Sequence, residues 1–189
     1  YVVPNALKRA YLEMLAAKVK NFKLGDPSLE ATECGPMVSE QAAAETAEAV
    51  RLSVKQGGKV VFGGNRLEGS FFEPTILDVP KEADVAKNLE IFAPVWTVIG
   101  YDTVEEALEI ANQSDYGLNG AVIGKDLKQL LYFAKNMEAG TIVINGSSHY
   151  MGYEVPFGGY KKSGLGREGT MECLMEMSQV KSIVLRQLY

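Results

Sequence analysis

The feature that most constrains the fold is a repeated strand pattern between residues 94 and 145. Three short apolar runs, "PVWTVIGY" (94–101), "NGAVIG" (119–124) and "TIVIN" (141–145), each have the length of a buried strand. Helical patterns fill the two intervals between these runs. Strands that are joined through helices by short connections pair in parallel. We therefore predict an α/β fold in which helices cover a parallel sheet.

The sequence also carries the signals that begin and end helices. Thr103 with Glu106 three residues later forms a capping box, and Asp126 is a favourable capping residue for the next helix. Gly140 is predicted to end that second helix. Nearer the start of the chain, Ser39 is predicted to cap an alanine-rich helix that a Gly-Gly pair ends.

Further elements are predicted in the first part of the chain. A helix is expected over 5–22, with its apolar face formed by Leu7, Tyr11, Met14, Leu15, Val19 and Phe22. A connector rich in glycine and proline (23–37) follows, and "KVVFGG" (59–64) predicts a short strand. "GSFFEPTILDV" (69–79) contains Pro74, which cannot donate a ladder hydrogen bond. This segment therefore favours an edge or crossing strand over a central one.

The end of the chain predicts one more helix and one more strand. "TMECLMEMSQ" (170–179) has a helical pattern, and "VKSIVLRQL" (180–188) has the pattern of a final strand. The apolar side chains of the helical segment are expected to fill the core: Met171, Leu174, Met175 and Met177. No repeat, low-complexity tract or linker divides the chain.

Composition and charge exclude several classes of partner. The 189 residues are 47% hydrophobic, and a chain of this length buries about 70% of its unfolded surface. The net charge of -5, from 24 acidic and 19 basic residues, offers no basic surface for nucleic acid. No apolar stretch approaches the roughly 18 residues of a membrane span, and the start lacks the pattern of a signal peptide. We expect neither a nucleic-acid nor a membrane partner.

A metal centre or a disulfide framework is not expected. Cys34 and Cys173 are far apart and lack C-x-x-C spacing, and His149 is the single histidine. The usual His/Cys ligand set for zinc therefore cannot be assembled.

The glycines of "KKSGLGREG" (161–169) match the G-x-G-x-x-G spacing of a dinucleotide fingerprint. That fingerprint requires a strand directly before it, a helix opening inside it, and an acidic residue about 20 positions later. Here a loop, "PFGGYKK" (156–162), precedes the glycines, and Arg186 and Gln187 stand where the acidic residue is needed. Only the helix is in place, so a separate nucleotide-binding domain is the weakest of the hypotheses.

Four stretches together resemble the aldehyde dehydrogenase superfamily, in its order and spacing: 24–41, 88–126, 139–146 and 156–169. The resemblance covers essentially the whole chain. It implies a Rossmann-like α/β catalytic domain with a parallel sheet over 1–179 and a C-terminal oligomerisation strand over 180–189. In that family the glycine-rich stretch 156–169 is a structural loop beside the substrate entrance.

The resemblance also implies a chemistry to which this chain contributes only a part. Members of the family oxidise an aldehyde to a carboxylic acid with NAD or NADP, through a cysteine thiohemiacetal and thioester. The family's nucleophile lies in a Gly-Gln-x-Cys context, and "YVVP" (1–4) resembles the strand just after it. The chain begins without methionine and inside an apolar run. We therefore expect a fragment whose nucleophilic cysteine, general-base glutamate and nucleotide-binding domain lie upstream of Tyr1.

Glu90 and Phe92, in "LEIFAPV" (89–95), are the predicted cofactor-binding residues. By resemblance, the Glu90 carboxylate accepts hydrogen bonds from the nicotinamide ribose hydroxyls, and Phe92 forms a wall beside the nicotinamide ring. Taken alone, these residues would be a solvated glutamate and a core phenylalanine. Ala93 departs from the glycine that is commoner in the family, which makes the local path of the loop less certain.

Asn145, His149 and Phe157 are the predicted residues of the substrate pocket. By resemblance, Asn145 and Phe157 border the tunnel through which the aldehyde enters. The loop between them carries His149, which could hydrogen-bond a polar substrate tail or simply be an exposed surface histidine. Neither Cys34, in the connector, nor Cys173, on the helical pattern, has a neighbour that would lower its thiol pKa, so both are predicted to be structural.

The last expectations concern assembly and location. The apolar strand at 180–188 would pair with another chain if left exposed, and by resemblance we expect a homodimer or homotetramer. We expect a cytoplasmic enzyme whose small-molecule partner is an aldehyde. The alternative is a non-catalytic oligomerisation or binding module that keeps the fold. The particular aldehyde, and the choice between NAD and NADP, are not determined by these residues.

Overall fold

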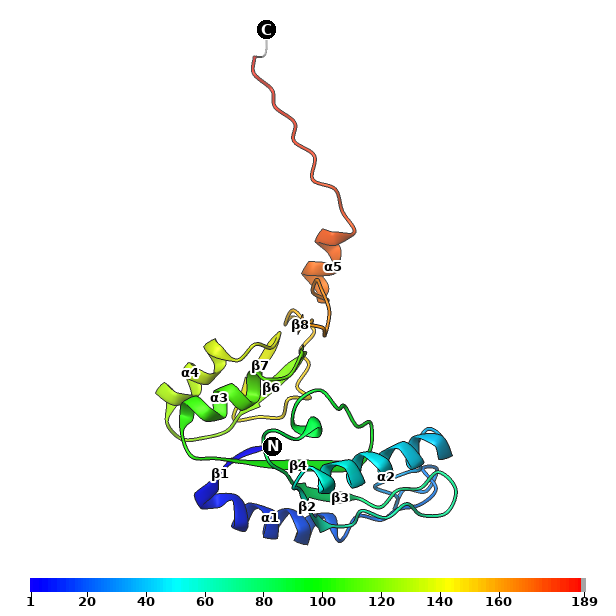
Figure 1. Ribbon diagram of the computed structural model, residues 1–189. Coiled ribbons are helices and arrows are strands. Elements are labelled where there is room, and N and C mark those ends of the chain that lie inside the picture. Colours follow the sequence, from blue (N-terminus) through cyan, green and yellow to red (C-terminus); the bar gives the residue numbers. More distant parts are fainter. Residues whose placement is uncertain (188–189) are drawn as a thin grey trace. The chain divides into compact units, whose positions relative to one another are not determined.

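The computed structural model describes residues 1–187 of the chain. It contains two compact units, 1–114 and 115–189, and Figure 1 shows the elements of both. The boundary falls between Ser114 and Asp115, where the sequence pattern predicted no linker. The assignment of 1–179 to a catalytic domain and of 180–189 to an oligomerisation strand stays a prediction.

A four-stranded sheet forms the centre of the first unit, in the order β1-β4-β3-β2. The strands are β1 (Val2–Pro4), β4 (Val95–Tyr101), β3 (Thr75–Asp78) and β2 (Lys59–Phe62). Strand β4 pairs in parallel with β1 on one side and with β3 on the other, and β2 is antiparallel to β3. The strands predicted within 94–101 and 59–64 are thus confirmed.

The prediction of an edge position for the segment around Pro74 is wrong. Strand β3 lies inside the sheet, between β4 and β2. Pro74 stands one residue before the first residue of β3, so its missing N–H removes no bond from the ladder. The first ladder donor on that side is the Thr75 amide, which donates to the Pro94 carbonyl at 2.8 Å.

The second unit contains a parallel pair and an antiparallel pair of strands. Strands β6 (Asn119–Val122) and β7 (Thr141–Ile144) are parallel and are joined through α4 (Leu127–Asn136), as the alternation predicted. The expected inclusion of 94–101 in the same ladder is wrong, because the ladder neighbours of β4 are β1 and β3. Strands β5 (Tyr116–Gly117) and β8 (Tyr160–Lys161), which the sequence did not indicate, form a short antiparallel pair.

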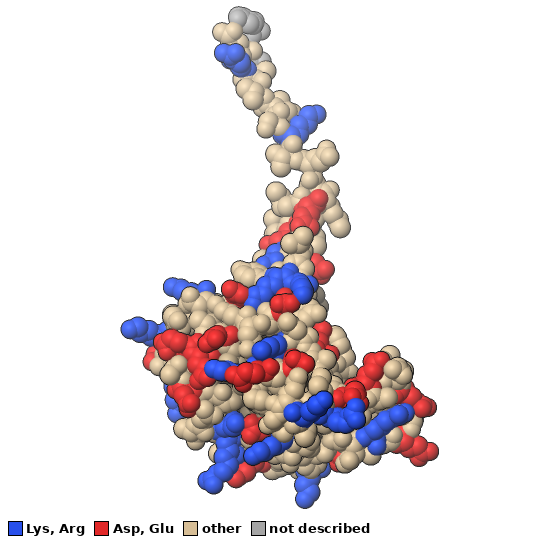
Figure 2. All heavy atoms as spheres, in the orientation of Figure 1, with Lys and Arg blue, Asp and Glu red and all other residues tan. Residues whose placement is uncertain are grey.

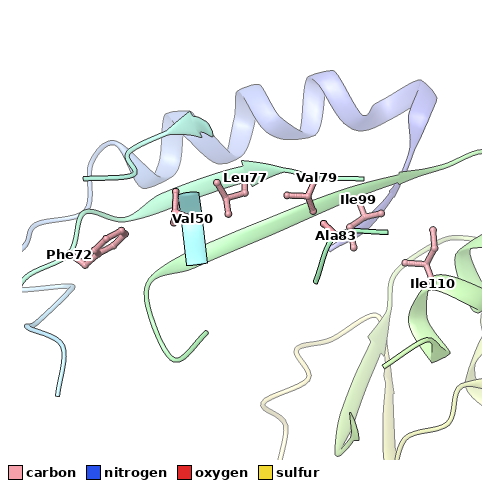
Figure 3. Close-up of a cluster of buried hydrophobic side chains, with 7 residues drawn as sticks. All are labelled: Val50, Phe72, Leu77, Val79, Ala83, Ile99 and Ile110. Atoms are coloured by element: carbon pink, nitrogen blue, oxygen red, sulfur yellow. The ribbon is translucent and has the colours of Figure 1, made fainter. Parts of the chain in front are cut away.

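Helices cover both faces of the sheet in the first unit. Helix α1 (Asn5–Val19) packs on one face, against Ile76 and Val98. Helices α2 (Glu40–Lys55) and α3 (Val104–Asn112) pack on the other, where Val50 and Ile110 meet Leu77 and Ile99. Neighbouring residues of β3 and β4 therefore point to opposite faces, and each face has an apolar layer. Figure 3 shows the layer that contains Leu77 and Ile99.

Helix α1 uses a narrower apolar face than the sequence suggested. It ends at Val19 rather than Phe22, although the Phe22 ring still packs edge-on against Trp96 at 5.7 Å between ring centres. Leu7 and Met14 are more than half exposed, so their predicted burial is wrong. The residues that face the sheet are Tyr11, Leu12, Leu15, Ala16 and Val19.

The predicted helix starts are confirmed by their side-chain hydrogen bonds. The Ser39 hydroxyl accepts from the Ala42 N–H at 3.0 Å, and the Asp126 carboxylate accepts from the first amides of α4. The prediction that Gly140 ends α4 is wrong, since the helix stops at Asn136. Gly140 is required for another reason: a Cβ there would lie 1.6 Å from the Gly158 carbonyl oxygen.

The helix expected near the end of the chain is confirmed as α5 (Thr170–Glu176), but its predicted burial is wrong. Its apolar side chains are 59–88% exposed, because no described element covers them: Met171, Leu174, Met175 and Met177. The final strand is not formed over 180–187, where the structure assigns neither helix nor strand. A strand requires a neighbour for its backbone hydrogen bonds. Residue 188 of that prediction lies outside the described residues.

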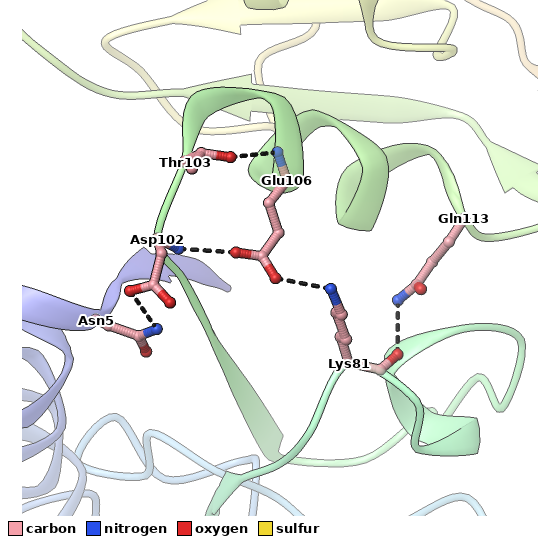
Figure 4. A network of polar contacts seen from close by, with 6 residues as sticks. All are labelled: Asn5, Lys81, Asp102, Thr103, Glu106 and Gln113. Carbon is pink, nitrogen blue, oxygen red and sulfur yellow. Dashed lines mark hydrogen bonds and ion pairs between the residues drawn. The ribbon is translucent and has the colours of Figure 1, made fainter.

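A polar network joins the start of α3 to the rest of the first unit (Figure 4). The Thr103 hydroxyl accepts from the Glu106 N–H at 3.1 Å, as the capping box predicts. The Glu106 carboxylate accepts from the Asp102 N–H at 2.9 Å and from the Lys81 ammonium at 2.7 Å. The Lys81 hydrogen bond is the main cause that lowers the pKa of Glu106, and the same pair raises the pKa of Lys81.

The buried layer predicts a large loss of stability on truncation at β3. Leu77 is completely buried, so Leu77→Ala removes its apolar contacts and leaves a cavity. We expect the free energy of unfolding to fall by about 2–5 kcal/mol. Urea unfolding of the chain, followed through its single tryptophan, Trp96, measures this change. Leu29→Ala, at a site that is 60% exposed, is the control and should change stability by less than about 0.5 kcal/mol.

The Glu106 network predicts a dependence of stability on acidic pH. A carboxyl whose pKa is lowered by folding stabilises the protein above its unfolded pKa, and this contribution is lost as pH falls through the folded pKa. The stability difference between the wild type and Glu106→Gln should therefore be full at neutral pH and should shrink below about pH 4.5. Unfolding measured from pH 7 to pH 3 tests this. Glu30→Gln, at an exposed position, should show no such trend; a constant difference for Glu106→Gln would contradict the account.

Candidate functional site

The residues predicted to bind a cofactor lie in the β4 loop, which we define as residues 87–94. Its first end is fixed by the Asp84 carbonyl, which accepts from the amides of Lys87, Asn88 and Leu89 at 2.9–3.0 Å. Its second end is fixed to the sheet by the Thr75–Pro94 hydrogen bond. The loop is therefore tied at both ends and enters the central strand directly.

Glu90 and Phe92 project from the middle of the β4 loop. Both side chains are exposed, and the Phe92 ring is 84% exposed. Within residues 1–187, no hydrogen bond or ion pair engages the Glu90 carboxylate. A core phenylalanine would be buried and a structural glutamate would be paired. Both side chains are thus available for a ligand.

Ala93 fits the loop without strain. The described non-glycine residues with a positive φ are Asn145 and Lys161, so Ala93 has an ordinary φ. Its N–H donates to the Ile91 carbonyl at 2.9 Å, and its carbonyl accepts from the Val95 N–H at 2.7 Å. The alanine found where the family more often has glycine is therefore compatible with an ordered path into β4.

Asn145 lies at the carboxyl end of β7, in the second unit. Its N–H donates to the Val122 carbonyl, and its side-chain oxygen accepts from the Gly124 N–H, both at 2.8 Å. These bonds hold its φ at 54°, a conformation that asparagine tolerates better than most residues. Asn145 thus ties together the ends of two parallel strands, the edge at which α/β sheets commonly bind ligands.

His149 lies in the exposed loop that follows Asn145. Its ring Nδ1 is 3.4 Å from the Ser147 hydroxyl, and its backbone N–H donates to the same oxygen at 3.2 Å. Tyr153, further along, is 94% exposed. The histidine is therefore oriented only by a residue two positions away, which is compatible with either a surface or a substrate-facing role.

Phe157 helps to close the glycine-rich loop. It forms an isolated antiparallel bridge with Glu168, with backbone hydrogen bonds of 2.6 Å in both directions. Inside this closure the Arg167 guanidinium lies over the Tyr160 ring at 5.4 Å. Strand β8, before the glycines, is antiparallel to β5, so the parallel strand that a dinucleotide fingerprint requires does not precede them.

The five predicted residues fall in two separate groups. Glu90 and Phe92 belong to the first unit, and Asn145, His149 and Phe157 belong to the second. Within residues 1–187, no hydrogen bond joins the last three to one another. Sequence reasoning missed Asp84, whose carbonyl fixes the β4 loop, because a short turn before a strand has no distinctive pattern.

Neither cysteine has the surroundings of a reactive thiol. Burial raises the pKa of Cys34, whose thiol donates a hydrogen bond to the neighbouring Gly35 carbonyl at 3.8 Å. Cys173 lies on the seven-residue helix α5, and both cysteines are free. The described residues contain no cluster of three or more histidine, cysteine, aspartate or glutamate side chains that could hold a metal.

The surface carries charges of both signs. On the face shown in Figure 2, lysine and arginine side chains are interspersed with aspartate and glutamate. The ion pairs of the described residues include Lys8 with Asp78 at 2.9 Å and Lys162 with Asp115 at 2.5 Å. In the part of the chain that the structure describes, no helix is long and apolar enough to cross a bilayer.

Comparison with known proteins gives a consistent result. The model of the aldehyde dehydrogenase family matches residues 1–183. Lactaldehyde dehydrogenase of Methanococcus aeolicus is 40% identical over 175 residues, which cover 93% of this chain and 37% of that protein. The Methanocaldococcus jannaschii lactaldehyde dehydrogenase is 39% identical over 184 residues, covering 97% and 39%.

Solved structures agree with these relatives. Glyceraldehyde-3-phosphate dehydrogenase of Methanocaldococcus jannaschii, complexed with NADP, matches with a TM-score of 0.93 at 39% identity, covering 98% of this chain and 40% of that one. Betaine aldehyde dehydrogenase of Staphylococcus aureus, in a point mutant with NAD⁺, matches at 0.86 and 35%, covering 93% and 37%. The chain spans 37–39% of the length of the first two curated relatives. The chain belongs to the aldehyde dehydrogenase family.

Proposed function

We propose that this chain is part of an NAD- or NADP-dependent aldehyde dehydrogenase that oxidises an aldehyde to a carboxylic acid. One observation of the structure carries the proposal most directly. The β4 loop is tied at both ends, yet the side chains of Glu90 and Phe92 project from it, are exposed, and have no partners among residues 1–187. The relatives named above, and the NADP and NAD⁺ in the solved structures, support the same activity.

The Glu90 and Phe92 side chains have the chemistry that a nicotinamide riboside needs. An ionised carboxylate only accepts hydrogen bonds, so Glu90 suits two neighbouring ribose hydroxyls. The exposed aromatic face of Phe92 suits the side of a planar ring. The dinucleotide, when bound, supplies a hydride acceptor. In this account the two residues bind and orient it, and neither exchanges a proton.

The reacting sulfur is proposed to lie outside residues 1–189. A nucleophilic cysteine needs a lowered thiol pKa, whereas burial raises that of Cys34. No hydrogen bond or ion pair within the described residues engages the Cys173 side chain. The chain covers less than half of each of the two lactaldehyde dehydrogenases named above, which leaves room for the nucleophile and the general base in the remaining polypeptide.

The second unit is proposed to contribute residues that contact the aldehyde substrate. The Asn145 side-chain oxygen is engaged by Gly124, which leaves both amide hydrogens for a polar substrate atom. Phe157 offers an apolar ring at the base of the glycine-rich loop. His149 and its exposed loop are proposed to meet the substrate tail.

A homodimer or homotetramer in the cytoplasm completes the proposal. Apolar residues near the end of the described chain are 71–88% exposed: Val180, Ile183, Val184 and Leu185. An exposed apolar segment of this kind favours pairing with another chain. The same exposure supports the alternative of a non-catalytic oligomerisation module. The two free cysteines fit a reducing compartment.

Substitution of Glu90 in the intact protein tests the proposed function. Removing a charged hydrogen-bond acceptor from a binding site should weaken NAD or NADP binding, or slow hydride transfer, by about tenfold or more. Glu90→Ala and Phe92→Ala should leave the melting temperature nearly unchanged, because both side chains are exposed. Calorimetric titration and single-turnover absorbance measure the two effects, with Glu30→Ala as the control. Unchanged affinity and rate in both variants would remove the cofactor assignment.

A further inference from the structure

We propose that Gln56 and Gln113 are positioning residues that hold the β4 loop in place for the cofactor. This inference rests on the proposed function. Each glutamine stands at the C-terminal end of a helix, α2 for Gln56 and α3 for Gln113. Both side chains reach the short turn η1 (Asp84–Ala86), which directly precedes the loop.

Gln56 holds Asp84 through two reciprocal hydrogen bonds. Its side-chain nitrogen donates to the Asp84 carboxylate at 2.8 Å, and its side-chain oxygen accepts from the Asp84 N–H at 2.9 Å. One amide group thus engages both the side chain and the backbone of the same residue. This pairing fixes the position of Asp84 and also its orientation.

Gln113 holds the same turn with a single donor group. Its side-chain nitrogen donates to the Ala86 carbonyl at 2.7 Å and to the Lys81 carbonyl at 3.1 Å. Figure 4 shows Gln113 directed at the Lys81 carbonyl. The two hydrogens of one NH₂ group therefore join positions on either side of Asp84. Ser114, the next residue, donates to the Asn88 side chain at 3.3 Å.

Asp84 transmits this restraint to the cofactor residues. Its carbonyl accepts from three successive amides, the last of which belongs to Leu89, the neighbour of Glu90. The far end of the loop is held by the sheet. The polypeptide between these ties carries Glu90 and Phe92. Order that exists before binding lowers the entropy lost when a ligand binds.

The two glutamines are far from the turn in the sequence, and the packing of their helices brings them to it. Gln56 is 28 residues from Asp84, and Gln113 is 27 residues from Ala86. Their helices pack on the same face of the sheet as the turn. The two helix ends thus approach η1 together, and their side-chain amides bond its backbone carbonyl and N–H groups and the Asp84 carboxylate.

The test uses the intact protein with Gln113→Glu and Gln56→Ala. Gln113→Glu keeps the shape but replaces both donated hydrogens with an anion that faces two carbonyls; Gln113→Ala serves if that variant does not fold. The amides of Lys87, Asn88 and Leu89 should exchange hydrogen about tenfold faster in each variant, and the dissociation constant for NAD or NADP should rise about fivefold to tenfold. Gln41→Ala is the matched control, because Gln41 bonds only Glu45 on the surface of α2.

Combination with Glu90→Ala separates positioning from general destabilisation. If Gln113 acts through Glu90 and Phe92, its effect on the cofactor dissociation constant should largely disappear in the Glu90→Ala, Phe92→Ala background. Equal effects in both backgrounds, or unchanged exchange at the three amides, would overturn the inference. If Glu90→Ala and Phe92→Ala leave the cofactor dissociation constant unchanged, the proposed function is overturned instead. The hydrogen-exchange rates of the three amides then still test whether the two glutamines hold the β4 loop.

Discussion

The structure depends most on the parallel pairing of β4 with strands on both of its sides. Because β1 and β3 flank it, β4 lies inside the sheet, and its neighbouring buried side chains Val98 and Ile99 enter the two apolar layers. Because β4 is bonded on both sides, it fixes the positions at which the preceding and following segments join the sheet. The β4 loop precedes it, and the capped start of α3 follows it, so one strand positions the proposed cofactor residues and the polar network around Glu106.

In this arrangement, the groups proposed to bind a ligand differ from the groups that hold the loop in place. The groups on which the proposed function rests, Glu90 and Phe92, are exposed and contribute little to packing, whereas the groups that hold them are backbone atoms and buried or half-buried side chains. Such a loop can present a ligand surface without weakening the core. Cys34, in contrast to these exposed side chains, has a partly buried thiol whose pKa is raised by burial. Under the proposed function, the chain provides surfaces that hold reactants rather than the atom that attacks.

Helix starts, which depend on neighbouring residues, were predicted well from the sequence. Strand pairings between segments far apart in the sequence were not. Ser39, Thr103 and Asp126 cap helices through amides two or three residues away, so their role is visible in a short window. The pairing of Thr75 with Val95 joins positions that no periodicity relates, and the place of β3 inside the sheet was therefore missed. The candidate site followed the same pattern: Glu90 and Phe92 were predicted from a motif and stay a prediction, while Gln56 and Asp84 are brought together only by folding. The exposure of α5 could not be predicted because it depends on what covers the helix, not on its apolar pattern.

The central claim is that this chain holds the reactants while a sulfur outside residues 1–189 attacks the aldehyde. The most direct measurement is the site of covalent modification in the intact protein. Limited treatment with iodoacetamide until aldehyde oxidation is lost, followed by peptide mass spectrometry, identifies the cysteine that reacts first. The account predicts one modified cysteine outside these 189 residues, with Cys34 and Cys173 unmodified. Modification of Cys34 or Cys173 in step with the loss of activity would contradict it.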